Sequence, residues 1–73
     1  MEQFSMRIKA LREERGLSQA QLGQIIGVKR YSIYTYEKGK SCPDMQGLIA
    51  LAEYFDVSLD YLVGRTDNRA VNR

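Results

Sequence analysis

The side chains most able to bind a partner gather on one face of a short predicted helix near the middle of the chain. Residues 19–36 predict a helix, a tight turn at Gly27 and a second helix, with apolar residues spaced so that the two helices pack together. The outer face of the second helix carries Lys29, Arg30, Tyr31, Tyr34 and Thr35. This face combines positive charge with hydrogen-bond donors and acceptors. A compact helix pair with such a face is suited to the major groove of DNA.

The residue types argue against catalysis. The chain has no histidine, so it lacks both a histidine acid–base catalyst and a Cys/His zinc set. Its single cysteine, Cys42, cannot close an intrachain disulfide. No histidine can activate a serine, cysteine or tyrosine nucleophile, and no paired carboxylates stand at a plausible spacing. We therefore expect no enzyme activity, no cofactor and no metal.

The length sets the size of the protein's core. A chain of 73 residues holds one small core and leaves no room for a separate domain that senses a small-molecule ligand. No apolar run approaches the roughly 20 residues that span a membrane. The first ten residues contain no apolar signal region, so we expect the protein in the cytoplasm, at the nucleoid.

Charge is distributed unevenly along the chain. Residues 1–40 contain eight basic and four acidic residues, a net charge of +4. Residues 41–64 contain four acidic residues and no basic one, and residues 65–73 carry a net charge of +2. A positive half joined to a negative half has a preferred side toward a polyanion. Ordinary surface charge would produce the same distribution, so charge alone does not decide.

Helix start and stop signals predict five helices and no strand. Ser5 is a possible cap for a first helix over residues 5–15, which Gly16 ends. Ser18 caps a second helix, where Gln21 completes a capping box, and Gly27 ends that helix because glycine adopts a left-handed turn at little cost.

The second half of the chain gives equally clear signals. The third helix is predicted over residues 29–38, and Pro43 breaks the pattern after it. Asp44 caps a fourth helix with a strong apolar stripe, and Ser58 caps a short fifth helix that Gly64 ends. The polar tail of residues 66–73 is expected to fray.

The chain resembles the helix-turn-helix family of phage Cro and repressor proteins and their bacterial relatives, the XRE family. Three segments carry the resemblance: RIKALREERGLSQAQLGQIIGV, then the spaced residues Ile33, Tyr36, Glu37 and Gly39, then PDMQGLIALAEYFDVSLDYLVGR. Together they cover residues 6–65. The resemblance implies an all-α, compact five-helix bundle of the lambda-repressor type, with helices two and three as the helix-turn-helix. It implies a DNA-binding domain over residues 1–65, followed by a tail over residues 66–73.

The resemblance also implies roles for single residues. The family positions that read bases correspond here to Arg30, Tyr31 and Thr35, with Lys29 and Tyr34 beside them. The positions that bind phosphates correspond to Gln19, Lys38, Lys40 and Ser41. Arg12 and Glu37 correspond to a pair that forms a structural salt bridge. The chemistry agrees, since arginine can bond guanine O6 and N7 with two donors while lysine suits phosphates. Gln19 stands at a helix N-terminus, which favours an anion, and Tyr36 is expected in the core.

The chain departs from the family pattern in four places: at Gly23, at Lys29, at Gly47, and at Tyr31 with Tyr34, which are bulkier than the residues common at those sites. Gly23 stands at a helix–helix contact where the family usually has alanine. Glycine weakens the second helix by about 0.5–1 kcal/mol relative to alanine, but it still permits close approach of the two helices. Lys29 stands where serine or threonine usually caps the recognition helix, so a cap of roughly 1 kcal/mol is lost. A bound phosphate would relieve the positive charge at this helix N-terminus, so we interpret Lys29 as a DNA contact.

Taken together, these features predict a sequence-specific regulator of transcription. One copy reads only a few base pairs, so we expect a homodimer on a near-palindromic operator of double-stranded DNA. It would act by blocking or touching RNA polymerase. The expected dimer surface consists of Leu59, Tyr61, Leu62, Val63 and Val71. The alternative is an antitoxin-like protein-interaction module that binds DNA secondarily, and apolar exposure on helices four and five would favour it.

Overall fold

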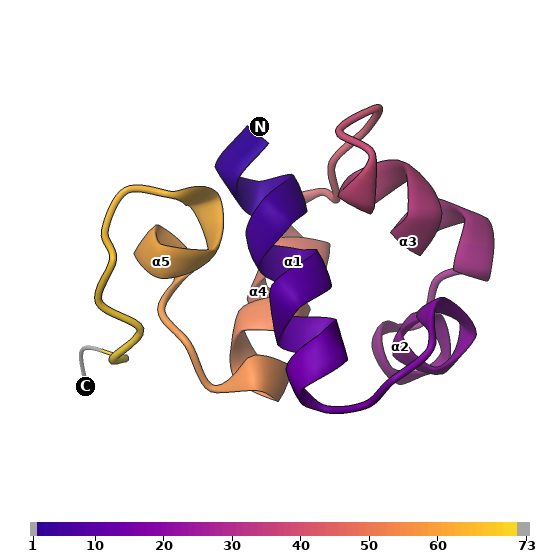
Figure 1. The fold of residues 1–73 in the computed structure, drawn as a ribbon, viewed down its shortest axis with the longest axis horizontal. Coiled ribbons are helices and arrows are strands. Elements are labelled where there is room, and N and C mark those ends of the chain that lie inside the picture. The colour runs from indigo at the N-terminus through magenta and orange to yellow at the C-terminus, as the bar shows by residue number, and fades with distance from the viewer. Residues whose placement is uncertain (1, 72–73) are drawn as a thin grey trace.

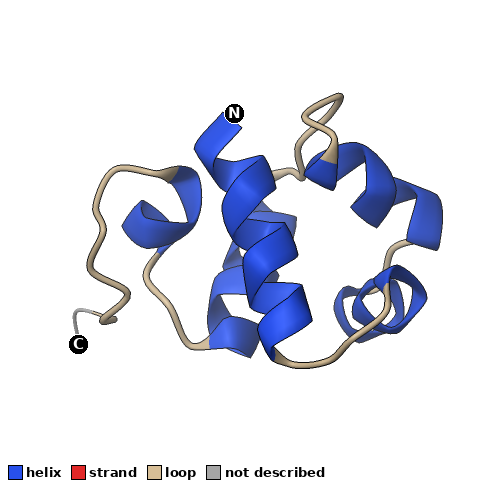
Figure 2. Ribbon diagram, in the orientation of Figure 1, coloured by secondary structure: helices blue, strands red, loops and turns tan. Residues whose placement is uncertain are grey.

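A computed structural model describes residues 2–71, and Figures 1 and 2 show its helices and loops. The helices are α1 (Glu2–Glu14), α2 (Gln19–Ile26), α3 (Arg30–Glu37), α4 (Met45–Phe55) and α5 (Leu59–Val63). The described residues contain no strand. The predicted all-α, five-helix fold is therefore confirmed.

The helices surround one apolar core. α1 crosses in front of α4, with α2 and α3 on one side and α5 on the other (Figure 1). The core side chains come from all five helices and from Val57: Phe4, Ile8, Leu11, Leu22, Ile33, Tyr36, Leu51, Ala52, Phe55, Val57 and Leu62. Tyr36 lies in this core, where its ring meets Phe4 edge to face at 6.2 Å between centroids.

Local caps start α2, α4 and α5 where the sequence predicts, and Gly27 and Gly64 end α2 and α5. The Ser18 hydroxyl accepts from the Gln21 amide at 3.0 Å, and the Gln21 side chain accepts from the Ser18 amide at 2.8 Å, which completes the capping box. Gly27 has the left-handed φ of 81° that ends α2. Asp44 caps α4 through the Gly47 amide at 2.8 Å, and Ser58 caps α5.

The first helix starts earlier than predicted. α1 already includes Glu2, so Ser5 lies inside the helix, almost buried, and the predicted cap at Ser5 is wrong. The reason is tertiary packing, because fully buried Phe4 anchors the first turn of α1 against the core. A local capping rule does not include this contact.

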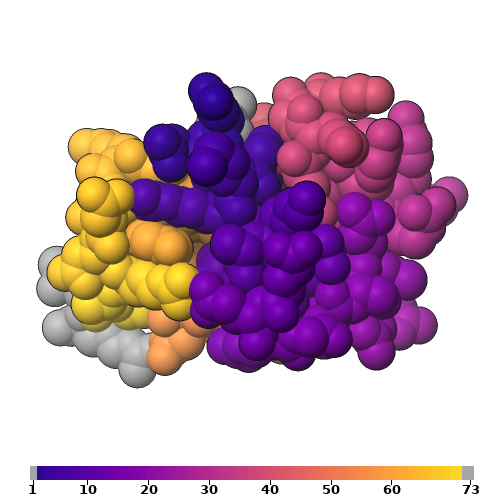
Figure 3. Space-filling view, in the orientation of Figure 1, coloured from indigo at the N-terminus to yellow at the C-terminus, as the bar shows by residue number. Residues whose placement is uncertain are grey.

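The C-terminal segment folds back along α1 and α5, so the expected fraying is wrong for residues 66–71, and residues 72 and 73 lie outside the described part of the chain. The Ser58 amide donates to the Arg69 carbonyl at 3.0 Å. The Arg69 guanidinium donates twice to the Glu14 carboxylate, at 3.0 and 2.6 Å. Figure 3 shows the yellow C-terminal part lying directly against α1. Tyr61 lies between two guanidinium groups, with Arg7 4.1 Å and Arg69 5.3 Å from its ring centroid.

Candidate nucleic-acid interface

α2 and α3 approach closely at a glycine. The Val28 amide donates to the Gly23 carbonyl at 2.8 Å, which closes the turn between the two helices. A Cβ atom added at Gly23 would lie 2.6 Å from the Val28 carbonyl oxygen. Only glycine allows this approach without a shift of backbone. The turn therefore fixes α3 tightly against α2, which is the feature that an exposed recognition helix requires.

The outer side of α3 presents free donors. Tyr31 is 65% exposed, and Lys29 and Arg30 are exposed beside it. Within residues 2–71, no hydrogen bond or ion pair occupies the side chains of Lys29 or Arg30. The Tyr31 and Tyr34 rings lie 6.1 Å apart at 30°, so the two phenols form one aromatic surface. These four side chains can contact base edges or phosphates without breaking any internal bond.

Thr35 is a correction to the sequence-based site. Its side chain is buried, at 9% exposure, and its hydroxyl donates to the Ser32 carbonyl at 2.8 Å. Thr35 therefore faces inward and does not belong to the base-reading surface. A hydroxyl has a single proton, so Ser41 must be the donor in the 2.7 Å bond between Thr35 and Ser41. That bond engages the Ser41 hydroxyl proton within the protein and ties the loop to α3.

A buried ion pair connects α1 to the last residue of α3. Arg12 donates to both carboxylate oxygens of Glu37, from Nε at 2.6 Å and from Nη2 at 3.1 Å, and also donates to the Leu17 carbonyl. The hydrogen bond to Glu37 raises the pKa of Arg12. Gln19 Nε2 donates to the same carboxylate at 3.2 Å. Glu37 thereby orients Gln19, the first residue of α2.

Positive charge continues beyond the end of α3. Lys38 and Lys40 are both exposed, and their Nζ atoms lie 5.8 and 5.9 Å from the Tyr34 ring centroid. Contact with the ring face holds both ammonium groups close to the outer side of α3. The cations predicted to bind phosphates therefore lie beside the residues predicted to read bases.

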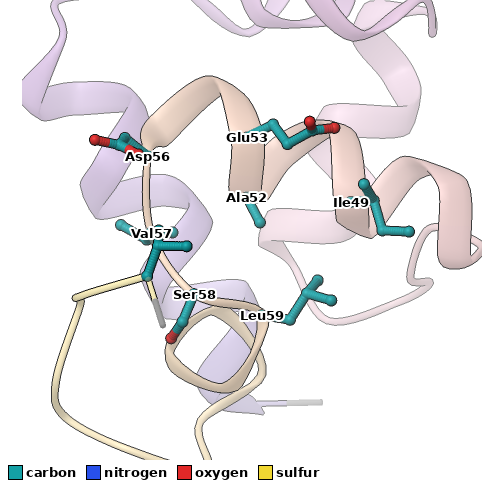
Figure 4. A pocket seen from close by; sticks show the side chains of 8 residues that line it. Ile49, Ala52, Glu53, Asp56, Val57, Ser58 and Leu59 are labelled. Atoms are coloured by element: carbon teal, nitrogen blue, oxygen red, sulfur yellow. The ribbon is translucent and has the colours of Figure 1, made fainter. Parts of the chain in front are cut away.

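The predicted dimer residues divide into accessible and covered ones. Leu62 is fully buried and contributes to the core instead, so it cannot form a dimer surface. Tyr61 is half-buried, and its ring contacts Arg7 and Arg69 within the chain. Leu59 and Val71 remain exposed and line a hollow of about 500 Å³ with Ile49. Figure 4 shows Ile49 of α4 and Leu59 of α5 pointing toward this hollow. Val63 is half-buried.

Sequence reasoning missed Lys9, an exposed residue of α1. Lys9 lines a second hollow, of about 230 Å³, together with a second residue of α1, residues of α2 and α3 and the lysine that follows α3: Arg12, Gln19, Tyr34, Glu37 and Lys38. A signal was available in the sequence. Lys9 precedes Arg12 by three residues and so shares its helix face, and the family resemblance already placed Arg12 against the third helix.

The described residues hold no membrane-spanning or metal-binding feature. None of the helices within residues 2–71 combines the length and apolar character needed to cross a membrane. The same part of the chain contains no group of three or more His, Cys, Asp or Glu residues that could hold a metal ion.

The chain belongs to the helix-turn-helix family, whose model matches residues 8–62. It is 35% identical over 65 residues to the HTH-type transcriptional regulator YobD of Bacillus subtilis, covering 89% of this chain and 58% of that protein. It is 34% identical over 64 residues to RstR, a cryptic phage CTXphi transcriptional repressor of Vibrio cholerae, covering 88% and 58%. The chain thus spans somewhat over half the length of these two relatives.

Solved structures agree with the sequence relatives. The P22 c2 repressor in complex with a synthetic operator superposes with a TM-score of 0.79 at 32% identity, covering 85% of this chain and 94% of that one. A transcriptional regulator from Listeria innocua gives a TM-score of 0.82 at 34% identity, covering 97% and 62%. These comparisons confirm the resemblance to phage-type repressors and the lambda-repressor type of fold.

Proposed function

We propose that this chain binds double-stranded DNA in a sequence-specific manner and regulates transcription. The observation that supports this function best is the outer side of α3, where Lys29, Arg30 and Tyr31 are exposed and the two cations have no internal partner among residues 2–71. The rigid turn at Gly23 holds that helix in place. The P22 c2 repressor, a similar structure, was solved in complex with an operator.

Base reading rests on the N-terminal part of α3. Arg30 is the first residue of the helix, the end that enters the major groove in helix-turn-helix proteins. Its guanidinium can donate to guanine O6 and N7 together. Tyr31 follows with a ring that can pack on a thymine methyl group. Lys29 stands before the helix with no side-chain cap, so its ammonium is available to a phosphate or a base edge.

Phosphate contacts would fix the register of α3 in the groove. Lys38 and Lys40 stand beyond the helix on the same side of the molecule, where flexible point charges can follow the DNA backbone. Gln19 offers an amide at the start of α2. Ser41 reaches a phosphate through its hydroxyl only by giving up its bond to Thr35.

The regulator would act as a homodimer on a near-palindromic operator, because one recognition helix specifies too few base pairs. The accessible apolar residues for such a dimer are Leu59 and Val71, with Ile49 beside them and Val63 partly available. When bound to the operator, the protein would block RNA polymerase or contact it. The protein would work in the cytoplasm, at the nucleoid.

A second function is supported by the same apolar hollow. Met45, Ile49 and Leu59 expose large side chains on α4 and α5, and Glu53 and Asp56 add acidic groups at the hollow. An antitoxin-like module would use this side to bind a different protein and would bind DNA secondarily. Such a module needs its partner for tight operator binding, whereas a homodimeric regulator binds alone.

Selection of duplexes from a random pool by the protein alone, followed by footprinting, tests the proposal. A regulator should enrich a near-palindrome whose half-site centres lie about 10 base pairs apart. Its affinity should fall by about 0.9 log units per log unit of salt for each phosphate neutralised. Lys38→Ala should weaken specific and random duplexes about equally. An unenriched pool combined with a flat salt response would reject DNA as the main partner.

A further inference from the structure

The second hollow lies where three helices meet. α1 contributes Lys9, α2 begins at Gln19, and α3 contributes Tyr34 and Glu37. Figure 1 shows α1 in the middle of the view with α2 and α3 to its right. The hollow's volume of about 230 Å³ is enough for a small group. The chemistry of the lining therefore decides what the hollow can hold.

The residues that line the hollow carry a net positive charge, because one ion pair among them is neutral and two lysines remain. Arg12 donates to both oxygens of Glu37, so these two charges compensate each other inside the protein. Lys9 and Lys38 also line the hollow, and within residues 2–71 neither ammonium is paired with a carboxylate. Two uncompensated ammonium groups at one small hollow attract an anion.

Neutral donors complete the lining. A carboxylate only accepts hydrogen bonds, so the contact with Glu37 requires that the amide nitrogen of Gln19, and not its oxygen, faces that carboxylate. That nitrogen has a second N–H, which makes no hydrogen bond to the described residues. The Tyr34 hydroxyl likewise makes no hydrogen bond to the described residues. The residues that line the hollow thus carry two ammonium groups, one amide N–H and one phenol O–H that form no hydrogen bond or ion pair among residues 2–71.

We propose that this hollow binds one backbone phosphate of the DNA strand, and that Lys9 and Tyr34 are phosphate contacts. The inference rests on the proposed function and assigns a role to Lys9, which the sequence had left without one. It also moves Tyr34 from base reading to phosphate binding. A phosphate in this position bridges α1, α2 and α3 at once. Because Glu37 belongs to the Arg12 ion pair, Glu37 is the positioning residue that orients Gln19 toward the phosphate.

Lys9→Gln tests the proposal, with Arg65→Gln as the matched control. Arg65 is a cation beyond α5 whose side chain is 78% exposed. The substitution Arg65→Gln removes one positive charge, as Lys9→Gln does, but at a position outside the hollow. Lys9→Gln should flatten the slope of log affinity against log salt by about 0.9 per protomer, whereas Arg65→Gln should leave the slope unchanged. Lys9→Arg keeps the charge and should keep the slope. Melting temperatures of all variants should match the wild type, because both positions are exposed.

Ethylation interference locates the contact. Ethylating a single DNA phosphate removes its charge, so wild type should show one sensitive phosphate in each half-site that becomes insensitive in Lys9→Gln. This readout separates a DNA phosphate from a free anion in the buffer. Suppose that the wild type selects a defined operator, but that Lys9→Gln shows the same salt slope and the same ethylation pattern as the wild type. That result would overturn this inference and leave the proposed function intact. A wild type without sequence preference and without a salt response would overturn the proposed function and this inference together.

Discussion

Arg12 and Glu37 join α1 to the end of α3 through two hydrogen bonds, of 2.6 and 3.1 Å, across 25 positions of sequence. Their side chains are 12% and 5% exposed. The pair is therefore shielded from water, and either charge would be left poorly solvated without the other. Because Glu37 is the last residue of α3, the pair fixes the recognition helix relative to the first helix as well as stabilising the fold.

Glu37→Gln should lower the free energy of unfolding by about 3 kcal/mol, the lower end of the range for a buried pair that loses one partner. The cause is the shielded guanidinium of Arg12, which loses its counter-charge. Denaturant unfolding measures the change. Asp60→Asn is the control, since the Asp60–Arg65 pair is exposed and 4.0 Å long and should contribute less than about 1 kcal/mol. Equal losses in the two variants would contradict a special role for the buried pair.

Lys29→Ser should change stability and DNA binding in opposite directions. Lys29 has the extended backbone of a cap residue, with φ −77° and ψ 157°, but makes no capping bond. A serine hydroxyl there should add about 1 kcal/mol of stability and remove a cation from a helix N-terminus. The same change removes a proposed DNA contact, so operator affinity should fall. Thermal melts and binding titrations measure the two effects.

Lys40→Ser is the control for that experiment. Lys40 is an exposed cation beyond the C-terminal end of α3, where no cap is missing. Its loss should weaken DNA binding without raising the melting temperature. If Lys29→Ser proves more stable and binds the operator as tightly as wild type, Lys29 is a poor cap residue with no function in DNA binding.

The sequence predicted the features that short-range chemistry determines. The Ser18 capping box and the left-handed Gly27 follow from rules that span three or four residues, and both are found. The exposed outer side of α3 follows from helical periodicity in the same way. Thr35 shows the limit of predicting exposure from helical periodicity. Periodicity places Thr35 at the border between the buried and exposed faces of α3, but the loop that carries Ser41 packs against it and buries it.

Long-range contacts account for the remaining differences. The bond from Arg69 to Glu14 spans 55 positions, so no local pattern in a polar tail reports it. Asp56 ends α4 with a left-handed φ of 54°. Glycine or asparagine usually takes this conformation at a helix end, so an aspartate there did not signal the end of the helix in the sequence. Lys9 required knowledge of how α1 packs against α3. Glu14, Arg69 and Lys9 thus have environments supplied by distant segments, whereas Asp56 was missed because its residue type hid a local turn.

The docked tail should make stability depend on pH through Glu14. Two hydrogen bonds from Arg69 lower the pKa of Glu14 below its usual value of 4.5. A carboxylate with a depressed folded pKa stabilises the fold fully above its unfolded pKa and loses that contribution as pH falls through the folded value. Glu14→Gln should therefore be less stable than wild type at neutral pH, and the difference should vanish in acid.

Denaturant unfolding of wild type and Glu14→Gln at a series of pH values checks this dependence. Glu13→Gln removes a neighbouring exposed carboxylate that forms no ion pair within the described residues, so it serves as the control. Glu13→Gln should keep the contact between Glu14 and Arg69 and the pH dependence that this contact gives to wild type. A Glu14→Gln difference that is already absent at neutral pH would mean that the tail does not rest on α1 in solution.

Arg30→Ala should relax base preference at one position in each half-site while leaving the fold intact. Arg30 is exposed on the first turn of α3, and its side chain forms no bond within residues 2–71 that the substitution would break. A bidentate contact to guanine contributes about 1–3 kcal/mol of discrimination. A single-base substitution scan of the selected operator, with wild type and Arg30→Ala, measures it. Lys38→Ala should lower affinity for every sequence alike. If Arg30→Ala keeps every base preference and loses only general affinity, Arg30 contacts a phosphate and base reading belongs to Tyr31 and its neighbours.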